Sequence, residues 1–406
     1  MKKLVFITFL LFLNQFLFSQ KIEKYIGKIQ LKELESIKAN FVININNKDQ
    51  SDSLQLFINK NAKINFLRIN NENSRFQELE VKNDLPDVKK IKIKGEFPKN
   101  FKLEIDYIYP LTKIENKTFQ YRKHWIEMNN FTAWFPFNRE NNSFQYELEF
   151  QIPKNYRLTS VGKIKKRNSK WSITNYNNTD DIPIVISDNF NIFKSKNNKI
   201  SFYTIDLSEK QRNQIADDSE IILDYYNRNF GSPSENNLIV AINPFSNPWS
   251  YTRKGYISLS LKNDYTEKDK LRLAHEIGHL WWSNNKIYGN GNDWLNEGFA
   301  EYSSLIWYKK YLSKVEYSNL LIKYKKAFDS EIKITKVRPE ESAFFEITYL
   351  KGAYFLYLLS EKIGELEMNK FLHKVNKMKI NNTLDLVTLL KNEYKKYDIT
   401  ELLNEI

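Results

Sequence analysis

Alternation of apolar and polar residues is the main pattern between residues 21 and 204. Successive side chains of a β-strand point to opposite faces, so a period of two predicts strands with one buried face. Asparagine-rich stretches and prolines separate the runs and predict turns. The strand-like segments are the short apolar runs 41–45 and 54–58 and the alternating runs 91–94, 101–105 and 144–150. We therefore expect an all-β domain over 21–204, built as a sandwich or a curved sheet.

Helical periodicity replaces this pattern from about residue 205. A helix signal begins at Ser208 and continues to about Phe230, where glycine and proline follow. Strands are predicted at 238–242 and 256–261, a helix from about 267 to 283, and further helices to residue 406. The predicted fold class is α+β, with an N-terminal all-β domain over 21–204 and a mainly helical domain over 205–406.

The first 20 residues differ from the rest of the chain. Lys2 and Lys3 precede an apolar run over 4–13, and polar residues follow. This arrangement is typical of a secretory signal peptide, with cleavage near Ser19 or Gln20. The apolar run is short for a transmembrane helix. We expect an exported protein, periplasmic or extracellular, without a stable membrane anchor after cleavage.

Composition narrows the possible partners. The net charge is +13 over 406 residues, but lysines are spread along the chain without a basic block, and this argues against nucleic-acid binding. The absence of cysteine excludes disulfides and a lipid-anchored N-terminus. An exported chain of this length can depend on its hydrophobic core instead. The sequence does not specify an oligomeric state.

The candidate chemistry lies in His275-Glu276-Ile277-Gly278-His279. Two histidines four residues apart lie on one face of a helix, where both imidazoles can bind one Zn²⁺. Glu276 can reach the remaining coordination position, which water occupies in catalytic zinc sites. Glu297, in the segment W-L-N-E-G on the next predicted helix, supplies a third ligand; Asp293 or Asn296 is predicted to cap that helix. The alternative interpretation is a helix with two structural histidines.

The third ligand distinguishes classes of zinc enzyme. A metzincin has glycine three and histidine six positions after the second histidine. Trp282 and Asn285 occupy those positions, so this class is excluded. A glutamate on a downstream helix is the gluzincin arrangement.

These motifs resemble the aminopeptidase N and leukotriene hydrolase family of gluzincins. Residues 280–296 separate His279 from Glu297, one residue fewer than in the family, which a deletion in the connector around Gly289 and Gly291 explains. Tyr349-Leu350-Lys351-Gly352 is similar to the family's Y-x-K-G segment. The resemblance implies a saddle-like or sandwich-like β domain, then a thermolysin-like catalytic domain with one Zn²⁺ per chain and a peptide substrate. It also implies a short form, without the family's large C-terminal helical domain.

Two further positions correspond to the family's anchors for a substrate's free amine. Glu127 stands nine residues before Pro136 in an F-P context, as the resemblance requires; its alternative is a solvated carboxylate. The family's G-x-M-E-N strand corresponds to the segment 250–254 before Gly255, and Thr252 replaces the glutamate. Glu127 and Thr252 are therefore candidate substrate-binding residues, and we expect a weakened preference for a free N-terminus.

The resemblance implies a role for each remaining candidate. Glu276 would act as general base, and the Tyr349 hydroxyl would stabilise the developing oxyanion, although Tyr349 could instead be a core aromatic. Glu301, one turn after Glu297, would orient a zinc-bound histidine or else remain an exposed carboxylate.

The expected function is that of an exported zinc peptidase, most simply an aminopeptidase. An endopeptidase, or a hydrolase of another amide or of an epoxide, stays open because one amine anchor is lost. A non-catalytic binding module on a peptidase scaffold is the alternative of another class.

Overall fold

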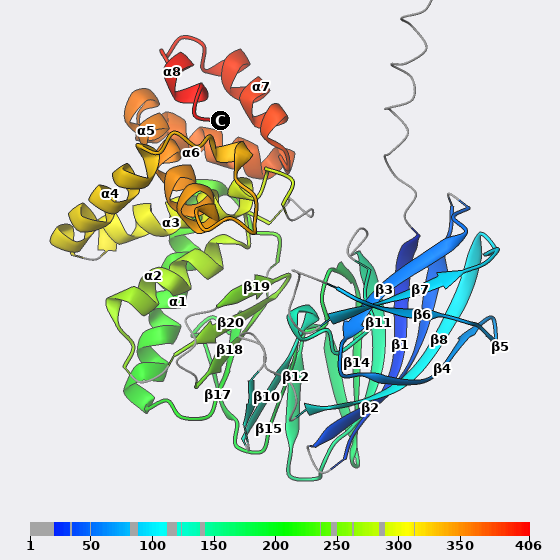
Figure 1. Cartoon of the computed structure of the whole chain (residues 1–406). Helices are drawn as coiled ribbons and strands as arrows, with labels where there is room; N and C mark the ends of the chain where they lie inside the picture. The colour runs from blue at the N-terminus through cyan, green and yellow to red at the C-terminus, as the bar shows by residue number, and fades with distance from the viewer. Residues whose placement is uncertain are drawn as a thin grey trace, which may run out of the picture. The chain divides into compact units, whose positions relative to one another are not determined.

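The computed structural model divides into two compact units, Met1–Asp188 (unit 1) and Asn189–Ile406 (unit 2) (Figure 1). The structure describes residues 20–32, 35–48, 50–81, 88–111, 120–122, 124–138, 143–235, 237–244, 250–261, 264–283, 289–311 and 313–406. Apart from Gln20, the predicted signal peptide lies outside the described residues. None of the helices in these ranges has both the length and the apolar character that crossing a membrane requires.

Unit 1 is a β domain whose described strands form three sheets. The orders are β13-β14-β11-β1-β2-β8-β4-β5 in the largest sheet, β12-β15-β10-β9 in the second and β3-β7-β6 in the third. A short 3₁₀ helix, Asn130–Thr132, follows β10. The strands are β1 (Lys21–Lys32), β2 (Ser36–Asn46), β3 (Ser53–Asn59), β4 (Lys63–Ile69), β5 (Glu72–Asn73), β6 (Gln77–Glu80), β7 (Val88–Lys94), β8 (Asn100–Pro110), β9 (Gln120–Arg122), β10 (Trp125–Met128), β11 (Phe144–Gln151), β12 (Arg157–Ser160), β13 (Lys163–Arg167), β14 (Lys170–Thr179) and β15 (Ile184–Ser187).

The alternating pattern in the sequence produces the core of unit 1. Along β2, every second side chain is buried, and Phe41 faces Ile105 across the antiparallel pairing with β8. A one-residue shift would turn these apolar side chains to the other face, so burial fixes the register. The predicted strands 41–45, 54–58, 91–94, 101–105 and 144–150 all lie within observed strands.

Unit 2 begins with a five-stranded mixed sheet in the order β16-β17-β18-β20-β19. Its strands are β16 (Asn191–Lys194), β17 (Ile200–Thr204), β18 (Leu238–Asn243), β19 (Tyr251–Arg253) and β20 (Tyr256–Ser260). β17 pairs in parallel with β18, so β16 and β17 belong to this unit. The predicted boundary after residue 204 therefore lies too late, because these two strands resemble the preceding β domain in sequence but pair with later strands.

Helices make up most of the remainder of unit 2. They are α1 (Glu209–Phe230), α2 (Glu267–Gly278), α3 (Trp294–Tyr311), α4 (Lys314–Phe328), a 3₁₀ turn (Ile334–Lys336), a π-helix (Glu346–Lys351), α5 (Gly352–Ile363), α6 (Glu365–Met378), α7 (Thr383–Glu393) and α8 (Thr400–Leu403). In Figure 1, α1 and α2 lie beside the sheet. The α+β class is confirmed: a β-rich N-terminal unit precedes a mainly helical one.

Local hydrogen bonds explain where α1 begins and where α1 and α2 end. Ser208 caps α1 and exchanges hydrogen bonds with Gln211, and Gly231 follows the helix with a φ of 81°, as the sequence predicts. By contrast, α2 ends at Gly278 rather than near residue 283. The amides of Leu280 and Trp281 turn back to carbonyls three residues earlier, which tightens the last turn and stops the helix.

Two glycines allow α3 to approach the π-helix and α5 closely. A Cβ atom on Gly298 would lie 3.1 Å from the Gly352 Cα and 3.1 Å from the Thr348 carbonyl oxygen. Both neighbours are backbone atoms, which cannot move away as a flexible side chain could. These glycines end the W-L-N-E-G and Y-x-K-G segments, so their contact brings together the two segments that carry Glu297 and Tyr349.

We expect Gly298→Ala to destabilise unit 2 by roughly 1–2 kcal/mol, because overpacking costs about 1–3 kcal/mol and the helix propensity of alanine returns up to about 1 kcal/mol. Thermal unfolding of the metal-free protein measures this. Gly95→Ala is the matched control, since a Cβ there meets no atom within 4 Å. A Gly298→Ala protein as stable as this control would show that the contact tolerates a methyl group.

Candidate metal centre

Three side chains predicted as metal ligands converge in unit 2. One carboxylate oxygen of Glu297, Oε2, lies 3.5 Å from His275 Nε2 and 3.3 Å from His279 Nε2. The three ligand atoms all lie within 4.8 Å of one another. The histidines come from the last turn of α2 and its C-cap, and Glu297 comes from the first turn of α3. The structure therefore brings together residues from two helices at one point.

Small residues allow these two helices to meet. A Cβ on Gly278 would lie 3.2 Å from the Cα of Ala300, so α2 and α3 pack almost backbone to backbone there. Ala274, Ile277 and Trp281 are buried in the core, as predicted, which turns the histidine face of α2 toward α3. His279 keeps a right-handed helical conformation as C-cap, so both imidazoles stay on the same face.

The other ring nitrogen of each histidine also has a partner. Glu301 Oε2 lies 2.7 Å from His275 Nδ1, and the Trp282 carbonyl oxygen lies 3.1 Å from His279 Nδ1. Tyr324 on α4 donates a hydrogen bond to the other oxygen of Glu301. The predicted contact between Glu301 and a histidine is present, and the alternative of an exposed carboxylate is wrong. These contacts leave both Nε2 atoms facing Glu297.

The pKa values of the cluster reflect its opposite charges. Burial alone would lower the pKa of His275, but hydrogen bonds to Glu297 and Glu301 and their charges outweigh burial and hold that pKa well above its usual range. Burial would raise the pKa of Glu297, yet the charge of His279 and hydrogen bonds to both imidazoles lower it. The pKa of Glu301 is likewise lowered by His275 and Tyr324 against the effect of burial. A cation at this point would replace the proton on His275.

The geometry of the cluster fits Zn²⁺. Zinc ligands at bond lengths of about 2.0–2.2 Å in a tetrahedron lie about 3.3–3.5 Å from one another. The distances from Glu297 to the two Nε2 atoms match this separation. Two imidazoles and one carboxylate form a donor set of catalytic zinc sites, which keep one position open. His275, His279 and Glu297 would hold the ion, and Glu301 and the Trp282 carbonyl would fix the imidazoles.

Glu276 and Thr252 contact each other beside this cluster. The Thr252 hydroxyl lies 2.7 Å from Glu276 Oε2 and 2.9 Å from the Glu276 carbonyl oxygen. Thr252 belongs to β19, an edge strand of the sheet, and Glu276 precedes Ile277 in the last turn of α2. The role of Thr252 in substrate binding stays a prediction, but its hydroxyl is engaged with Glu276.

Tyr349 lies in the π-helix and stacks against the cluster. Its ring centroid is 5.7 Å from that of His275, with an angle of 10° between the planes. Single π-helical turns occur often at functional sites. The adjacent Lys351 is fully buried; its Nζ donates to the Ser330 carbonyl at 2.6 Å and pairs with Glu405 at 2.7 Å. Lys351 therefore anchors the end of the π-helix to two other segments of unit 2.

Glu127 belongs to unit 1, whereas the other candidates belong to unit 2. It lies in β10, where its backbone pairs with Val185, and its side chain accepts a hydrogen bond from Trp125 Nε1 at 3.2 Å. Only 1% of Glu127 is exposed, so the alternative of a solvated carboxylate is wrong. Its role as an amine anchor stays a prediction.

Two features of the site escape a motif search. Tyr324 contacts Glu301 from α4, but no local pattern marks it in the sequence. The contact of Thr252 with Glu276 likewise depends on how β19 lies beside α2. Asp293 directly precedes α3; its carboxylate accepts from the Gly289 amide, and its backbone carbonyl accepts from the Glu297 amide.

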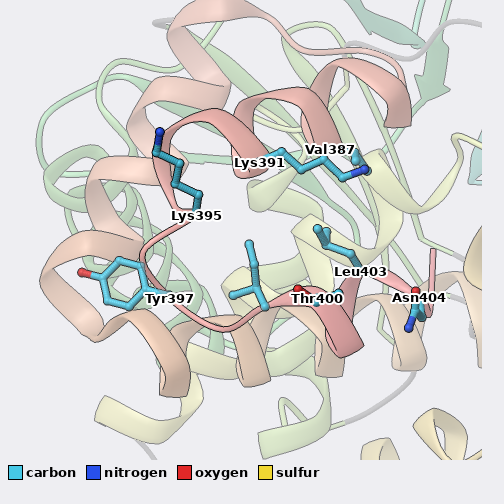
Figure 2. Close-up of a pocket in the computed structure, with 8 residues that line it drawn as sticks. Val387, Lys391, Lys395, Tyr397, Thr400, Leu403 and Asn404 are labelled. Atoms are coloured by element: carbon cyan, nitrogen blue, oxygen red, sulfur yellow. The ribbon is translucent and has the colours of Figure 1, made fainter.

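A cavity of about 290 Å³ lies elsewhere in unit 2, between α7 and α8. Figure 2 shows Lys391 and Val387 on one side of it and Leu403 on the other. Its lining contains none of the candidate metal ligands or their partners.

Comparison with known proteins gives matches to one peptidase family over part of the chain. The Peptidase family M1 domain matches residues 258–405. Human endoplasmic reticulum aminopeptidase 2 is 28% identical over 237 residues, which are 51% of this chain and 24% of that protein. Mitochondrial aminopeptidase 2 of Saccharomyces cerevisiae is 26% identical over 242 residues, which are 52% of this chain and 25% of that protein. The chain thus spans about a quarter of the length of these curated relatives.

Solved structures share the fold over most of the chain. The M1 zinc metallopeptidase from Deinococcus radiodurans superimposes with a TM-score of 0.70 at 14% identity, covering 95% of this chain and 93% of that one. Native yeast LTA4 hydrolase superimposes with a TM-score of 0.75 at 16% identity, and the match covers 95% of this chain and 66% of that one.

The fold is similar to that of zinc metallopeptidases, and His275, His279 and Glu297 form a donor set of the kind that the gluzincin class uses. Residues 258–405 match the Peptidase family M1 domain, in agreement with the resemblance seen in the sequence.

We expect Zn²⁺ uptake by the metal-free protein to release about one proton per ion near pH 7, because metal-ligating imidazole must be neutral. The raised pKa of His275 keeps that ring protonated at this pH before zinc binds. Since protons compete with zinc, the affinity should rise with pH until the pH exceeds this raised pKa. Calorimetry in buffers of different ionisation enthalpy counts the protons.

The Glu301→Gln variant is the control for this measurement. It removes one carboxylate that raises the pKa of His275, so fewer protons should be released at the same pH. Its zinc affinity should fall about 10–100-fold, as is typical when a partner of a ligand is lost. An affinity of the unaltered protein that falls as the pH rises would contradict the proposed ligand set.

Proposed function

We propose that this protein is a zinc-dependent peptidase that hydrolyses peptide bonds, most simply an aminopeptidase. The observation that carries the proposal is the convergence of His275, His279 and Glu297 on one point, with Glu276 adjacent. The curated relatives are aminopeptidases by name, and a mutant of the Deinococcus enzyme has been solved with a Tyr-Ser-Ala substrate bound.

Each side chain has a distinct part in the proposed reaction. Zinc, when bound, would polarise the substrate carbonyl and acidify a water molecule. The Glu276 carboxylate takes the proton of the attacking water and passes it to the leaving amine. The Tyr349 hydroxyl donates a hydrogen bond to the carbonyl oxygen as negative charge develops there. Glu301 and the Trp282 carbonyl hold the two imidazoles in orientation.

Export is part of the proposal. The basic start and the apolar run over 4–13 support a signal peptide. The chain contains no cysteine, which is compatible with an oxidising compartment.

One observation favours a second candidate function. Thr252 stands where the resemblance places an amine-binding glutamate, and its hydroxyl contacts Glu276. A neutral side chain in that position cannot form an ion pair with a substrate's free amine. This supports an endopeptidase, or a hydrolase of another blocked amide, that uses the same metal centre.

We expect Glu276→Gln to lower turnover by about 10²–10⁴-fold, the usual contribution of a general base, while about one zinc per chain is retained. An amide cannot accept the water proton, but the zinc ligands are unchanged. Hydrolysis of aminoacyl fluorogenic amides, with and without chelator, measures turnover, and metal analysis measures zinc.

The matched control is Glu267→Gln, the same change in the first turn of α2, where the carboxylate is exposed and forms an ion pair with Lys270. Its activity should equal that of the unaltered protein. Full turnover by Glu276→Gln would remove Glu276 as the base, and chelator-insensitive turnover would contradict the zinc mechanism.

We expect a free-amine peptide amide to be hydrolysed less than about 10-fold faster than its N-acetylated form. A hydrogen bond between charged groups contributes about 1.5–3 kcal/mol, or roughly 10–100-fold, and Thr252 cannot supply one of the two expected anchors. The ratio of kcat/KM for the two peptides is the measurement. A preference above about 100-fold for the free amine would show that other side chains replace the missing anchor.

A further inference from the structure

Thr252 contacts two different oxygens of one residue on another element. Its hydroxyl lies 2.7 Å from a carboxylate oxygen of Glu276 and 2.9 Å from the carbonyl oxygen of the same residue. Among the described residues, Thr252 is the one side chain that donates a hydrogen bond to the Glu276 carboxylate. Glu276 is 5% exposed, so this donor acts where water has little access.

The carbonyl contact has a clear cause in the end of α2. The last four carbonyls of a helix lack partners within the helix. In a continuing α-helix the Leu280 amide would donate to the Glu276 carbonyl, but here it donates to the Ile277 carbonyl at 3.0 Å. The Thr252 hydroxyl lies within hydrogen-bond reach of this carbonyl, shares its one hydrogen between it and the nearer carboxylate oxygen, and so attaches the end of α2 to the edge strand β19.

The backbone around Thr252 is itself held in position. Thr252 pairs with Ile257 of β20, and its carbonyl accepts a hydrogen bond from Arg253 Nη1 at 2.9 Å. The Arg253 guanidinium in turn lies 5.0 Å from the centre of the Tyr251 ring. Threonine is also β-branched, which restricts its χ1 angle. The hydroxyl is therefore a fixed donor, in contrast to one on a flexible side chain.

We propose that Thr252 is a positioning residue that holds the Glu276 carboxylate in the orientation needed for proton transfer. The inference rests on the proposed role of Glu276 as base. A base must lie within hydrogen-bond reach of the proton that it takes, so rotation of the carboxylate would slow the reaction. With Oε2 held by Thr252, Oε1 is the oxygen left to accept the proton.

A purely structural role of Thr252 would have different consequences. If the hydroxyl served the Glu276 carbonyl alone, its loss would weaken the contact of α2 with β19 and lower stability without a specific effect on turnover. If it positions the carboxylate, its loss lowers kcat even where the protein is fully folded and fully loaded with zinc. The two readings also differ in whether Thr252 is coupled to the side chain at 276.

The test compares Thr252→Val, which keeps the shape and loses the donor, with Thr252→Ser, which keeps the donor. We expect Thr252→Val to lower kcat about 10–100-fold, the usual effect of losing such a support, with KM and zinc content nearly unchanged. Thr252→Ser should recover most of this loss. All assays are run well below the unfolding temperature of each variant.

A second measurement does not depend on turnover. Melting temperatures of the zinc-free Thr252→Val, Glu276→Ala and double variants form a double-mutant cycle. We expect the loss in the double variant to be smaller than the sum of the single losses, because both single changes break the same hydrogen bond. Additive losses would show that Thr252 serves the carbonyl alone and would overturn the proposal.

The kinetic outcomes separate this proposal from the proposed function. Unchanged kcat in Thr252→Val, or a loss in Thr252→Ser equal to that in Thr252→Val, would overturn the positioning role while Glu276→Gln remains inactive. An unaltered protein without chelator-sensitive hydrolysis would instead refute the proposed function. In that case the double-mutant cycle alone decides whether Thr252 holds the carboxylate.

Discussion

The metal centre depends on close backbone contacts between three helical segments. Gly278 allows α2 to pack against Ala300 of α3, and Gly298 allows α3 to pack against Gly352 at the start of α5. Because no side chains separate these segments, Glu297 reaches both histidines and the Tyr349 ring stacks on His275. A larger residue at either glycine would move α3 by a few tenths of an ångström or more, and metal ligands tolerate little displacement.

The same convergence buries several charged side chains close together, and neighbouring residues partly compensate these charges. Buried charges are costly unless they are paired and hydrogen-bonded. Glu301 is paired with His275 and hydrogen-bonded by Tyr324, and Glu276 is hydrogen-bonded by Thr252. Glu297 is paired with both imidazoles, and a divalent cation at this point would replace the proton of His275 in that pairing. Metal binding and the stability of this region are therefore linked.

Features encoded by neighbouring residues could be predicted from the sequence, whereas features that depend on distant segments could not. The H-E-x-x-H and W-L-N-E-G motifs are local patterns, and they led to residues that lie together in the structure. The β-strands of unit 1 followed from period-two alternation. The unit boundary and the contact of Tyr324 with Glu301 depend on pairing and packing between distant segments, which periodicity and spacing do not report. The early end of α2 follows from a tightened last turn that the helical pattern does not mark.

Thr252 connects the geometry of the site with the choice of substrate. The position expected to carry a substrate-binding carboxylate carries a hydroxyl directed at the Glu276 side chain. Cations follow it: Arg253 donates to the Thr252 carbonyl, and Lys254 pairs with Glu235 at 3.3 Å. A second glutamate beside Glu276 would place two carboxylates in a nearly dry site, which is unfavourable unless an amine binds between them. Threonine avoids this repulsion in the absence of substrate, but it gives up an ionic contact with a charged N-terminus. Under the proposed function, threonine at this position would favour a prearranged base over recognition of the free amine.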